Sequence, residues 1–402
     1  MGVIILKKAF TKILSVFIAI LLFCMGAVWA FAESDPVLIN EVTTNASAGE
    51  GTLSLPCASA ILMDAKTGTV IYEQNADAAL PPASVTKIMT LLLVMEAIDA
   101  GKIALGDMVT VSANAASMGG SQVYLKEGET MSVEEMLKCV VIASANDCAV
   151  ALAELVAGSE EGFVSAMNQR AAELGMINTH FENTNGLDDT ATNHVTSARD
   201  IAIMSRELIS HPKILEYSGI WMDTIRDGSF GLTNTNRLVR FYPGCTGLKT
   251  GSTSKAKFCI SATAQRDGLS LICVIMAAQT RDARNAAAAK LLDYGFAGFS
   301  SYHCGSGEET VRVEGGVLPE CHVRYQEFNA LIPKGQSTSV EKVIDLPETL
   351  TAPLLAGDEV GKVVFKLNGK EIGSVPICVT EPIEKIGFGT LFCRLLSQFL
   401  LM

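Results

Sequence analysis

The sequence predicts a mixed α+β domain, with an antiparallel sheet flanked by helices, followed by a smaller all-β module. Helical segments alternate with strands that pair as hairpins up to about residue 300, and strand patterns then dominate until the last segment. Of the 402 residues, 49% are hydrophobic and 18% are charged, which is too apolar for a disordered chain and long enough for two or three domains. The hairpins argue against a doubly wound parallel sheet.

The charge of the chain argues against one class of partner. Lys and Arg number 31 against 43 Asp and Glu, which gives a net charge of −12. A nucleic-acid partner is therefore disfavoured. The five histidines and 11 cysteines contain no H-E-x-x-H and no C-x-x-C pattern, so we predict neither a metal site nor a cofactor.

Residues 1–32 have the pattern of a secretory signal peptide. Lys7, Lys8 and Lys12 precede an uncharged apolar run over residues 13–28, and a small-x-small cleavage site ends at Ala32. We therefore expect an exported chain that begins after Ala32. An uncleaved N-terminal anchor helix is the alternative.

The exported chain begins with a predicted linker over residues 33–55, much of it rich in Ser, Thr, Asn, Ala and Gly. Strand-like runs at residues 58–63 and 69–72 then flank a turn that contains Gly68, which predicts a hairpin. A helix follows over residues 84–100 and stops at a glycine.

A second pair of helices is predicted around a Ser-Ala-Asn triplet. Ser132 to Glu135 form a capping box at the start of the first helix, which should break near Ser144 to Asn146. Residues 147–156 resume the helical pattern and end by Gly158. The triplet therefore lies at a junction of two helices, where side chains can point into a cleft.

Two strand-like runs, residues 257–264 and 269–277, are joined by a four-residue turn that ends in glycine. This pattern predicts an antiparallel hairpin. An Ala-rich helix over residues 284–296 follows it. These elements complete the α+β domain, which we place at residues 56–300.

The end of the chain combines strands with one amphipathic segment. Runs such as residues 310–313 and 362–367 predict the all-β module, which we place at residues 301–382. In residues 383–402 apolar side chains recur at steps of three and four, with Arg394 in the middle. This segment is marginal for spanning a bilayer of about 30 Å, so we expect it to lie in a membrane interface. A helix packed on the protein's own core is the alternative.

A Ser-x-x-Lys motif could supply a nucleophile and its base. A serine in the first helical turn and a lysine three residues later lie on one face, as at Ser84 and Lys87. The lysine acts as a base only when burial or another cation lowers its pKa. Taken singly the motif is weak, because the same spacing occurs four more times in this chain.

Order and context select one set of motifs. Lys-Thr-Gly occurs twice and Ser-x-Asn twice. Only one combination places Ser-x-x-Lys at a helix start, Ser-x-Asn at a helix junction and Lys-Thr-Gly just before a strand pair, in this chain order. That combination is Ser84 and Lys87, Ser144 and Asn146, and Lys249-Thr250-Gly251.

With these motifs the sequence resembles the low-molecular-mass penicillin-binding proteins of the D-alanyl-D-alanine carboxypeptidase family. The stretches that carry the resemblance are residues 80–90, 144–154, 183–187, 196–200, 247–253 and 291–296. The resemblance implies a β-lactamase/transpeptidase-like domain with a helical subdomain. It also implies a serine enzyme that removes the terminal D-Ala from peptidoglycan stem pentapeptides through an acyl-enzyme and binds β-lactam antibiotics covalently.

The resemblance further implies a role for each catalytic residue. Ser84 attacks the carbonyl of the penultimate D-Ala, and Lys87 accepts its proton, kept neutral partly by the charge of Lys249. Ser144 relays a proton toward the leaving amine. Asn146 holds the substrate amide and the lysine.

Backbone N–H groups of Ser84 and Ser252 are expected to form the oxyanion hole. The residues expected to bind the substrate are Asn146, Lys249, Thr250, Gly251, Ser252 and Arg284. For Arg284 a solvated arginine at a helix start is the alternative.

Other functions remain open from the residues alone. They are a β-lactamase or a D,D-endopeptidase of the same fold, and a catalytically silent penicillin-binding protein. Signal pattern, motifs and terminal helix together predict an exported enzyme at the outer face of the bacterial cytoplasmic membrane, held peripherally by its C-terminal helix.

Overall fold

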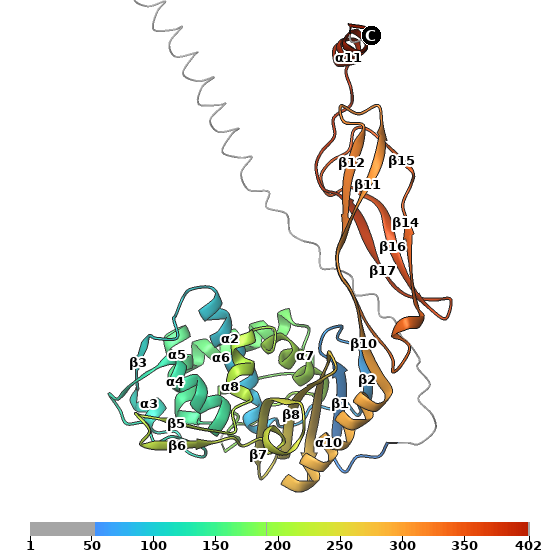
Figure 1. The fold of residues 1–402 in the computed structure, drawn as a ribbon. Coiled ribbons are helices and arrows are strands. Elements are labelled where there is room, and N and C mark those ends of the chain that lie inside the picture. The colour runs from blue at the N-terminus through green and yellow to red at the C-terminus, as the bar shows by residue number, and fades with distance from the viewer. Residues whose placement is uncertain (1–52, 190, 401–402) are drawn as a thin grey trace, which may run out of the picture. The chain divides into compact units, whose positions relative to one another are not determined.

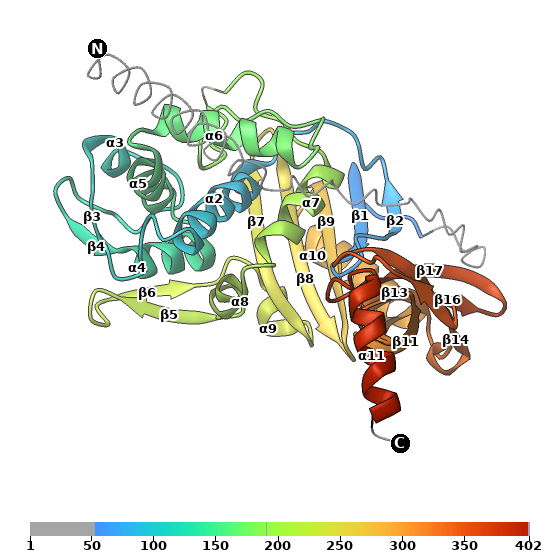
Figure 2. The same cartoon turned by 90° about the horizontal axis from the view of Figure 1, so that it is seen from above.

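The structure, a computed structural model, describes residues 53–189 and 191–400 of the chain. The predicted signal peptide and most of the predicted linker lie outside the described residues. Figures 1 and 2 show a sheet flanked by helices in the larger part of the chain and further strands that follow helix α10 (Arg281–Gly298) in the sequence. The predicted fold class, an α+β domain followed by an all-β domain, is confirmed.

The central sheet has five antiparallel strands in the order β2-β1-β9-β8-β7. Its strands are β1 (Ser59–Asp64), β2 (Val70–Gln74), β7 (Cys245–Thr253), β8 (Lys257–Arg266) and β9 (Leu269–Ala278). Both predicted hairpins are present, with β1 paired to β2 and β8 paired to β9.

Helices cover both faces of this sheet, as Figure 2 shows. In β1 the side chains of Ile61 and Met63 belong to one buried cluster, and those of Ala60 and Leu62 belong to another. This alternation follows from the two-residue period of a strand. The first cluster includes residues of α2 (Lys87–Asp99) and α7 (Ala198–Leu208), and the second includes residues of α10 (Arg281–Gly298). Burial on both faces explains the nearly continuous apolar sequence of the inner strand β9.

A helical subdomain with two small two-stranded sheets adjoins the central sheet. Its helices are α3 (Ala113–Ala116), α4 (Val133–Lys138), the π-helix η2 (Cys139–Ala143), α5 (Asn146–Ala157), α6 (Glu160–Glu173), α8 (Pro212–Ser218) and α9 (Leu238–Phe241). Its strands are β3 (Met108–Thr110), β4 (Thr130–Ser132), β5 (Met222–Ile225) and β6 (Phe230–Thr233). The predicted cap begins α4, where the Ser132 hydroxyl accepts a hydrogen bond from the Glu135 N–H at 3.2 Å.

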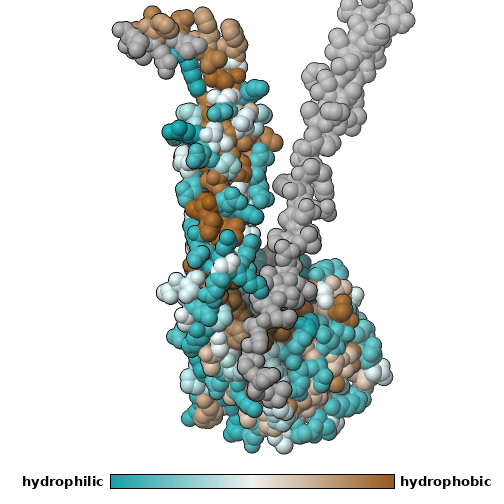
Figure 3. All heavy atoms as spheres, turned by 90° about the vertical axis from the view of Figure 1, so that its right-hand side faces the viewer, coloured by the Kyte–Doolittle hydropathy of each residue, from teal (hydrophilic) through white to brown (hydrophobic). Residues whose placement is uncertain are grey.

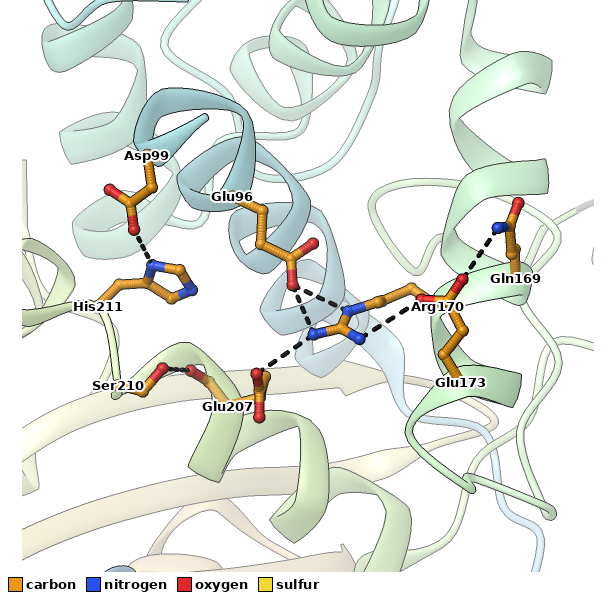
Figure 4. A network of polar contacts seen from close by, with 8 residues as sticks. All are labelled: Glu96, Asp99, Gln169, Arg170, Glu173, Glu207, Ser210 and His211. Carbon is orange, nitrogen blue, oxygen red and sulfur yellow. Dashed lines mark hydrogen bonds and ion pairs between the residues drawn. The ribbon is translucent and has the colours of Figure 1, made fainter. Parts of the chain in front are cut away.

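One arginine links three of the helices (Figure 4). Arg170 on α6 forms ion pairs with Glu96 on α2 at 2.8 Å, with Glu207 on α7 at 3.2 Å and with Glu173 at 3.4 Å. These side chains are between 23% and 48% exposed, so each ion pair contributes little by itself. Together they join α6 to α2 and to α7 through a single side chain.

The C-terminal domain consists of strands. They are β10 (Phe299–Cys304), β11 (Gly307–Glu314), β12 (Glu320–Tyr325), β13 (Phe328–Pro333), β14 (Val340–Asp345), β15 (Thr349–Thr351), β16 (Glu359–Leu367) and β17 (Lys370–Val379), with a 3₁₀-helix η3 (Ser337–Ser339). Six strands form one sheet in the order β14-β16-β17-β12-β11-β15, and β10 pairs with β13. The rings of Phe328 and Phe365 stack 4.1 Å apart in its core.

Helix α11 (Phe388–Leu400) forms the end of the described chain. It begins five residues after the start of the predicted segment 383–402, and the preceding Ile386 N–H donates to the Gly315 carbonyl. Its exposed apolar side chains are Phe388, Leu391, Phe392, Leu396, Phe399 and Leu400. The helix, at the top of Figure 3, accordingly has a largely apolar surface. None of the helices among the described residues has the length and apolar character needed to cross a bilayer.

Candidate active site

The predicted nucleophile lies in a tight turn ahead of α2. Residues Ala83–Thr86 form a 3₁₀-helix, and α2 begins at Lys87, so the first turn is 3₁₀ where the sequence predicts α-helix. A 3₁₀ turn brings residues i and i+3 onto one line. The amine of Lys87 therefore lies 2.9 Å from the hydroxyl of Ser84, as the Ser-x-x-Lys spacing predicts.

The Lys87 side chain is fully buried, and its amine has three polar neighbours. These are Ser84 Oγ at 2.9 Å, Asn146 Oδ1 at 2.6 Å and the Asn185 carbonyl oxygen at 2.8 Å. The two amide oxygens can only accept, whereas the Ser84 hydroxyl can also donate. A neutral amine has two N–H donors and one lone pair, so it satisfies all three neighbours when Ser84 O–H donates to it.

One cation, Lys249, lies close enough to influence this amine, and a second cation, Arg284, influences Lys249. Burial and the charge of Lys249 lower the pKa of Lys87 well below its ordinary value, and the charge of Asp147 opposes them. Burial and the charge of Arg284 lower the pKa of Lys249 to about 7. Burial and the charge of Lys249 therefore favour the neutral form of the Lys87 amine, while Lys249 titrates near pH 7.

The predicted helix junction brings Ser144 and Asn146 to the same place. The π-helix η2 ends at Ser144, whose φ of 63° and ψ of 31° are left-handed, and α5 starts at Asn146. π-Helical turns often occur at functional sites. Lys249 Nζ donates to Ser144 Oγ at 2.8 Å. Asn146 Nδ2 donates to the Gly119 carbonyl at 2.6 Å, which turns its Oδ1 toward Lys87.

A buried carboxylate supports this junction. Asp147 is completely buried and accepts hydrogen bonds from the N–H groups of Val123, Leu125 and Cys148 at 3.0–3.1 Å. These bonds tie the loop before β4 to the start of α5. Asp147 was not among the predicted site residues, although it directly follows the Ser-x-Asn motif.

The Lys-Thr-Gly strand packs directly on the Ser84 turn. A Cβ atom at Gly251 would lie 2.7 Å from the Pro82 carbonyl oxygen and 2.9 Å from the Ser84 nitrogen, which is closer than real Cβ atoms approach. The third position of the motif must therefore be glycine for β7 to approach this closely. Ser252, the next residue, has an exposed side chain.

Thr250 has a partner that the sequence did not predict. Its hydroxyl donates to Thr235 Oγ1 at 2.8 Å, and the Thr235 N–H donates to the Ile142 carbonyl in η2. Thr235 thus connects β7 to the helix that ends at Ser144. It lies in the Asn-Thr-Asn segment 234–236, for which the motifs give no signal.

Arg284 differs from the other predicted residues. Its side chain is 3% exposed and donates to the Cys259 carbonyl at 3.3 Å and to Asn285 Oδ1 at 2.9 Å. The alternative of a solvated arginine is therefore wrong. Among the described contacts, its guanidinium has no hydrogen bond to the other predicted site residues. It acts on the site through its charge, which lowers the pKa of Lys249.

One more loop completes the site, and the sequence predicted no role for it. It is the stretch 183–187, in which the Asn185 carbonyl accepts from Lys87. A Cβ atom at Gly186 would lie 1.9 Å from the Ala83 carbonyl oxygen, so this glycine packs on the peptide that precedes Ser84. A backbone carbonyl carries no residue-type signal, but the Asn-x-Asn-Gly pattern is itself typical of a structured turn.

The arrangement therefore contains a hydroxyl group, a buried amine beside it whose pKa is strongly lowered, and a second buried amine that donates to a second hydroxyl. These are the groups needed for acyl transfer without a metal ion.

Comparisons with known proteins agree with this chemistry. A family profile described as D-alanyl-D-alanine carboxypeptidase matches residues 43–280, and one described as the C-terminal domain of penicillin-binding protein 5 matches residues 323–385. The D-alanyl-D-alanine carboxypeptidase DacF of Bacillus subtilis is 40% identical over 378 residues, covering 92% of this chain and 94% of that protein. DacC of Escherichia coli is 38% identical, covering 85% of this chain and 89% of that protein.

Solved structures give the same result. Penicillin-binding protein 5 from Haemophilus influenzae matches with a TM-score of 0.74 at 32% identity, covering 84% of this chain and all of that chain. Penicillin-binding protein D2 from Listeria monocytogenes in its ampicillin-bound form matches with a TM-score of 0.57 at 32% identity, covering 61% of this chain and all of that chain.

Proposed function

The chain belongs to the family of serine D-alanyl-D-alanine carboxypeptidases, which are low-molecular-mass penicillin-binding proteins, and from this membership we propose how its residues divide the reaction. It is a serine-type hydrolase with D,D-carboxypeptidase activity that binds penicillin. The observation that carries the assignment of residues is the contact of 2.9 Å between Ser84 Oγ and a fully buried Lys87 amine. The substrate we propose is the D-Ala-D-Ala end of a peptidoglycan stem pentapeptide.

Acylation begins at Ser84. Its Oγ forms a bond to the carbonyl carbon of the penultimate D-Ala while its proton passes to the neutral Lys87 amine. The N–H groups of Ser84 and Ser252 stabilise the negative charge that develops on the carbonyl oxygen. Collapse of this intermediate breaks the C–N bond, and the leaving D-Ala amine takes a proton that Ser144 relays.

Deacylation uses the same groups in reverse. A water molecule gives a proton to Lys87 and its oxygen attacks the ester carbonyl. The ester C–O bond then breaks, and Ser84 regains its proton. With a β-lactam, the attack of Ser84 opens the lactam ring and forms an ester. Because this ester hydrolyses slowly, the opened antibiotic stays covalently attached to Ser84.

The carboxylate of the terminal D-Ala needs a cation and hydroxyl donors. Lys249, Thr250 and Ser252 lie along one strand beside Ser84, and Lys249 is the cation among them. Arg284, which is buried and donates to the Cys259 carbonyl of β8, contributes charge rather than a direct contact. This placement makes the site select a free carboxyl end, which favours carboxypeptidase over endopeptidase activity.

The test is D-Ala release from diacetyl-Lys-D-Ala-D-Ala by the wild-type chain beside Ser84→Ala. Ser210→Ala is the matched control, because Ser210 begins a chance Ser-x-x-Lys pattern and its exposed hydroxyl donates to the Glu207 carbonyl. We expect release to vanish in Ser84→Ala and to stay unchanged in Ser210→Ala. Release by Ser84→Ala at the wild-type rate would refute the assignment.

Two further outcomes separate the remaining alternatives. Rapid turnover of nitrocefin by the wild type would indicate a β-lactamase. A penicillin adduct together with no D-Ala release from any peptide would indicate a catalytically silent penicillin-binding protein.

We further propose that the enzyme is exported and attached to the outer face of the cytoplasmic membrane. The pattern of residues 1–32 supports export, and the exposed apolar side chains of α11 support attachment. In cell fractionation, a chain that ends at Lys385 should move from the membrane to the soluble fraction. Replacing the exposed Phe388, Phe392 and Phe399 with serine should do the same, whereas replacing Thr390 and Ser397 with alanine should not.

A further inference from the structure

A chain of hydrogen bonds runs from the peptide before Ser84 to a buried histidine. The Thr86 hydroxyl donates to the Ala83 carbonyl at 2.8 Å, and His194 Nε2 lies 2.7 Å from the same hydroxyl. The other ring nitrogen, His194 Nδ1, accepts from the Glu182 N–H at 3.0 Å. Thr86 is completely buried and His194 is 7% exposed, and the mechanism above uses neither side chain.

The protons of this chain have one arrangement. A backbone N–H can only donate, so His194 Nδ1 carries no proton and the neutral ring holds its proton on Nε2. Nε2–H therefore donates to Thr86 Oγ1, whose single proton goes to the Ala83 carbonyl. Burial lowers the pKa of His194 to about 4, against the opposing charges of Glu182 and Asp188, so the ring is neutral at pH 7.

The Ala83 carbonyl and the Ser84 N–H belong to one peptide unit. In a planar trans peptide the C=O and N–H bonds point in opposite directions, so a bond that fixes the carbonyl also aims the N–H. The Ser84 nitrogen faces β7, since a Cβ atom at Gly251 would lie 2.9 Å from it. Ala83 itself has a φ of 48°, a left-handed conformation that alanine rarely adopts without support.

We propose that His194, acting through the Thr86 hydroxyl, is a positioning residue that aims the Ser84 N–H at the oxyanion of the acylation step. The inference rests on the proposed function, in which this N–H is one of two oxyanion donors. Charge on the carbonyl oxygen develops only as the transition state forms, so aiming the donor affects that state and not initial binding. Loss of these hydrogen bonds therefore lowers the acylation rate constant k2 and leaves the dissociation constant Ks of the encounter complex unchanged.

The test compares Thr86→Val with Thr86→Ser in the full chain by stopped-flow acylation with a fluorescent penicillin, which separates k2 from Ks. Removal of an oxyanion donor costs about 10²–10³-fold in rate, and a misaimed donor costs part of that, so we expect k2 to fall about 10- to 100-fold in Thr86→Val. Ks should stay within about twofold, and Thr86→Ser, which keeps the hydroxyl, should restore k2. If Thr86→Val does not fold, His194→Phe, which keeps a ring but removes the donor, tests the same chain.

Ser205→Ala is the matched control for the loss of a buried hydroxyl. Ser205 is completely buried, and its hydroxyl pairs with that of Ser261 at 2.8 Å, so the described hydrogen bonds of Ser205 do not include residues 83–86. It should lose a comparable amount of unfolding free energy and keep the wild-type k2. Wild-type k2 in both Thr86→Val and His194→Phe, a loss confined to Ks, or no rescue by Thr86→Ser would overturn the inference. Continued acylation of Ser84→Ala would instead overturn the proposed function.

Discussion

Gly251→Ala tests whether the close contact between β7 and the Ser84 turn sets the catalytic geometry. The new Cβ would lie 2.7 Å from the Pro82 carbonyl oxygen and 2.9 Å from the nitrogens of Ser84 and Val85. Ordinary contacts begin near 3.4 Å, so strand and turn must separate by about 0.7 Å. All three neighbours are backbone atoms, so no side chain can rotate to relieve the overlap.

The expected loss follows from this displacement. A misplacement of about 1 Å at a reacting centre can cost about 10²-fold in rate, so k2 for penicillin should fall about 10- to 100-fold in Gly251→Ala. Overpacking at a rigid contact should lower the free energy of unfolding by about 1–3 kcal/mol. Stopped-flow acylation and urea unfolding measure the two effects separately.

Gly231→Ala is the matched control for the same substitution in a strand. Gly231 lies in β6, and a Cβ atom added there meets nothing within 4 Å. Its k2 and its unfolding free energy should stay close to those of the wild type. Gly251→Ala with the wild-type k2 would show that the contact does not position Ser84 and would refute the reasoning.

Three more predictions concern charged groups. The pKa of Lys249 is lowered to about 7, so its positive charge is lost as the pH rises through that value, and k2/Ks for an anionic penicillin should fall there. Arg284→Met removes one of the charges that lower this pKa, so it should move the midpoint of the same titration to a higher pH. The folded-state pKa of His194 is lowered to about 4, whereas its unfolded pKa is about 6.5, so the stability it contributes is full above pH 6.5 and is lost as the pH falls toward 4. In urea unfolding, the free energy of unfolding should therefore fall by up to about 3 kcal/mol between these pH values through His194. His194→Gln should lack this pH dependence. Arg170→Met should lower the unfolding free energy by about 1 kcal/mol and leave k2 unchanged, since its ion pairs are partly exposed; a large loss of k2 would contradict the structural role assigned to it.

The sequence predicted the architecture where local chemistry decides it. The turns at Gly68 and Gly268 and the cap at Ser132 are local signals, and the hairpins and the α4 start appear where these signals place them. The motif order also predicted that Ser84, Lys87 and Asn146 would meet, and the structure places them in contact.

The contacts of the site that the sequence did not predict depend on tertiary packing. The Asn185 carbonyl reaches Lys87 only because Gly186 lets its loop approach the Ala83 peptide. The burial of Arg284 depends on how α10 packs on the sheet, which the composition of a helix start does not reveal. The link between Thr250 and Thr235 joins two segments by hydroxyl groups that occur throughout the chain.

The three basic side chains of the site influence one another in one order, from Arg284 to Lys249 to Lys87. Arg284 is buried and stays charged, and its charge helps to lower the pKa of Lys249 to about 7. The charge of Lys249 in turn helps to lower the pKa of Lys87, which burial has already lowered. Lys87 is completely buried between two amide oxygens and the Ser84 hydroxyl, so its surroundings favour the neutral amine that a base for Ser84 requires. This base therefore depends on a charge, that of Lys249, which lies outside the direct hydrogen bonds of Ser84.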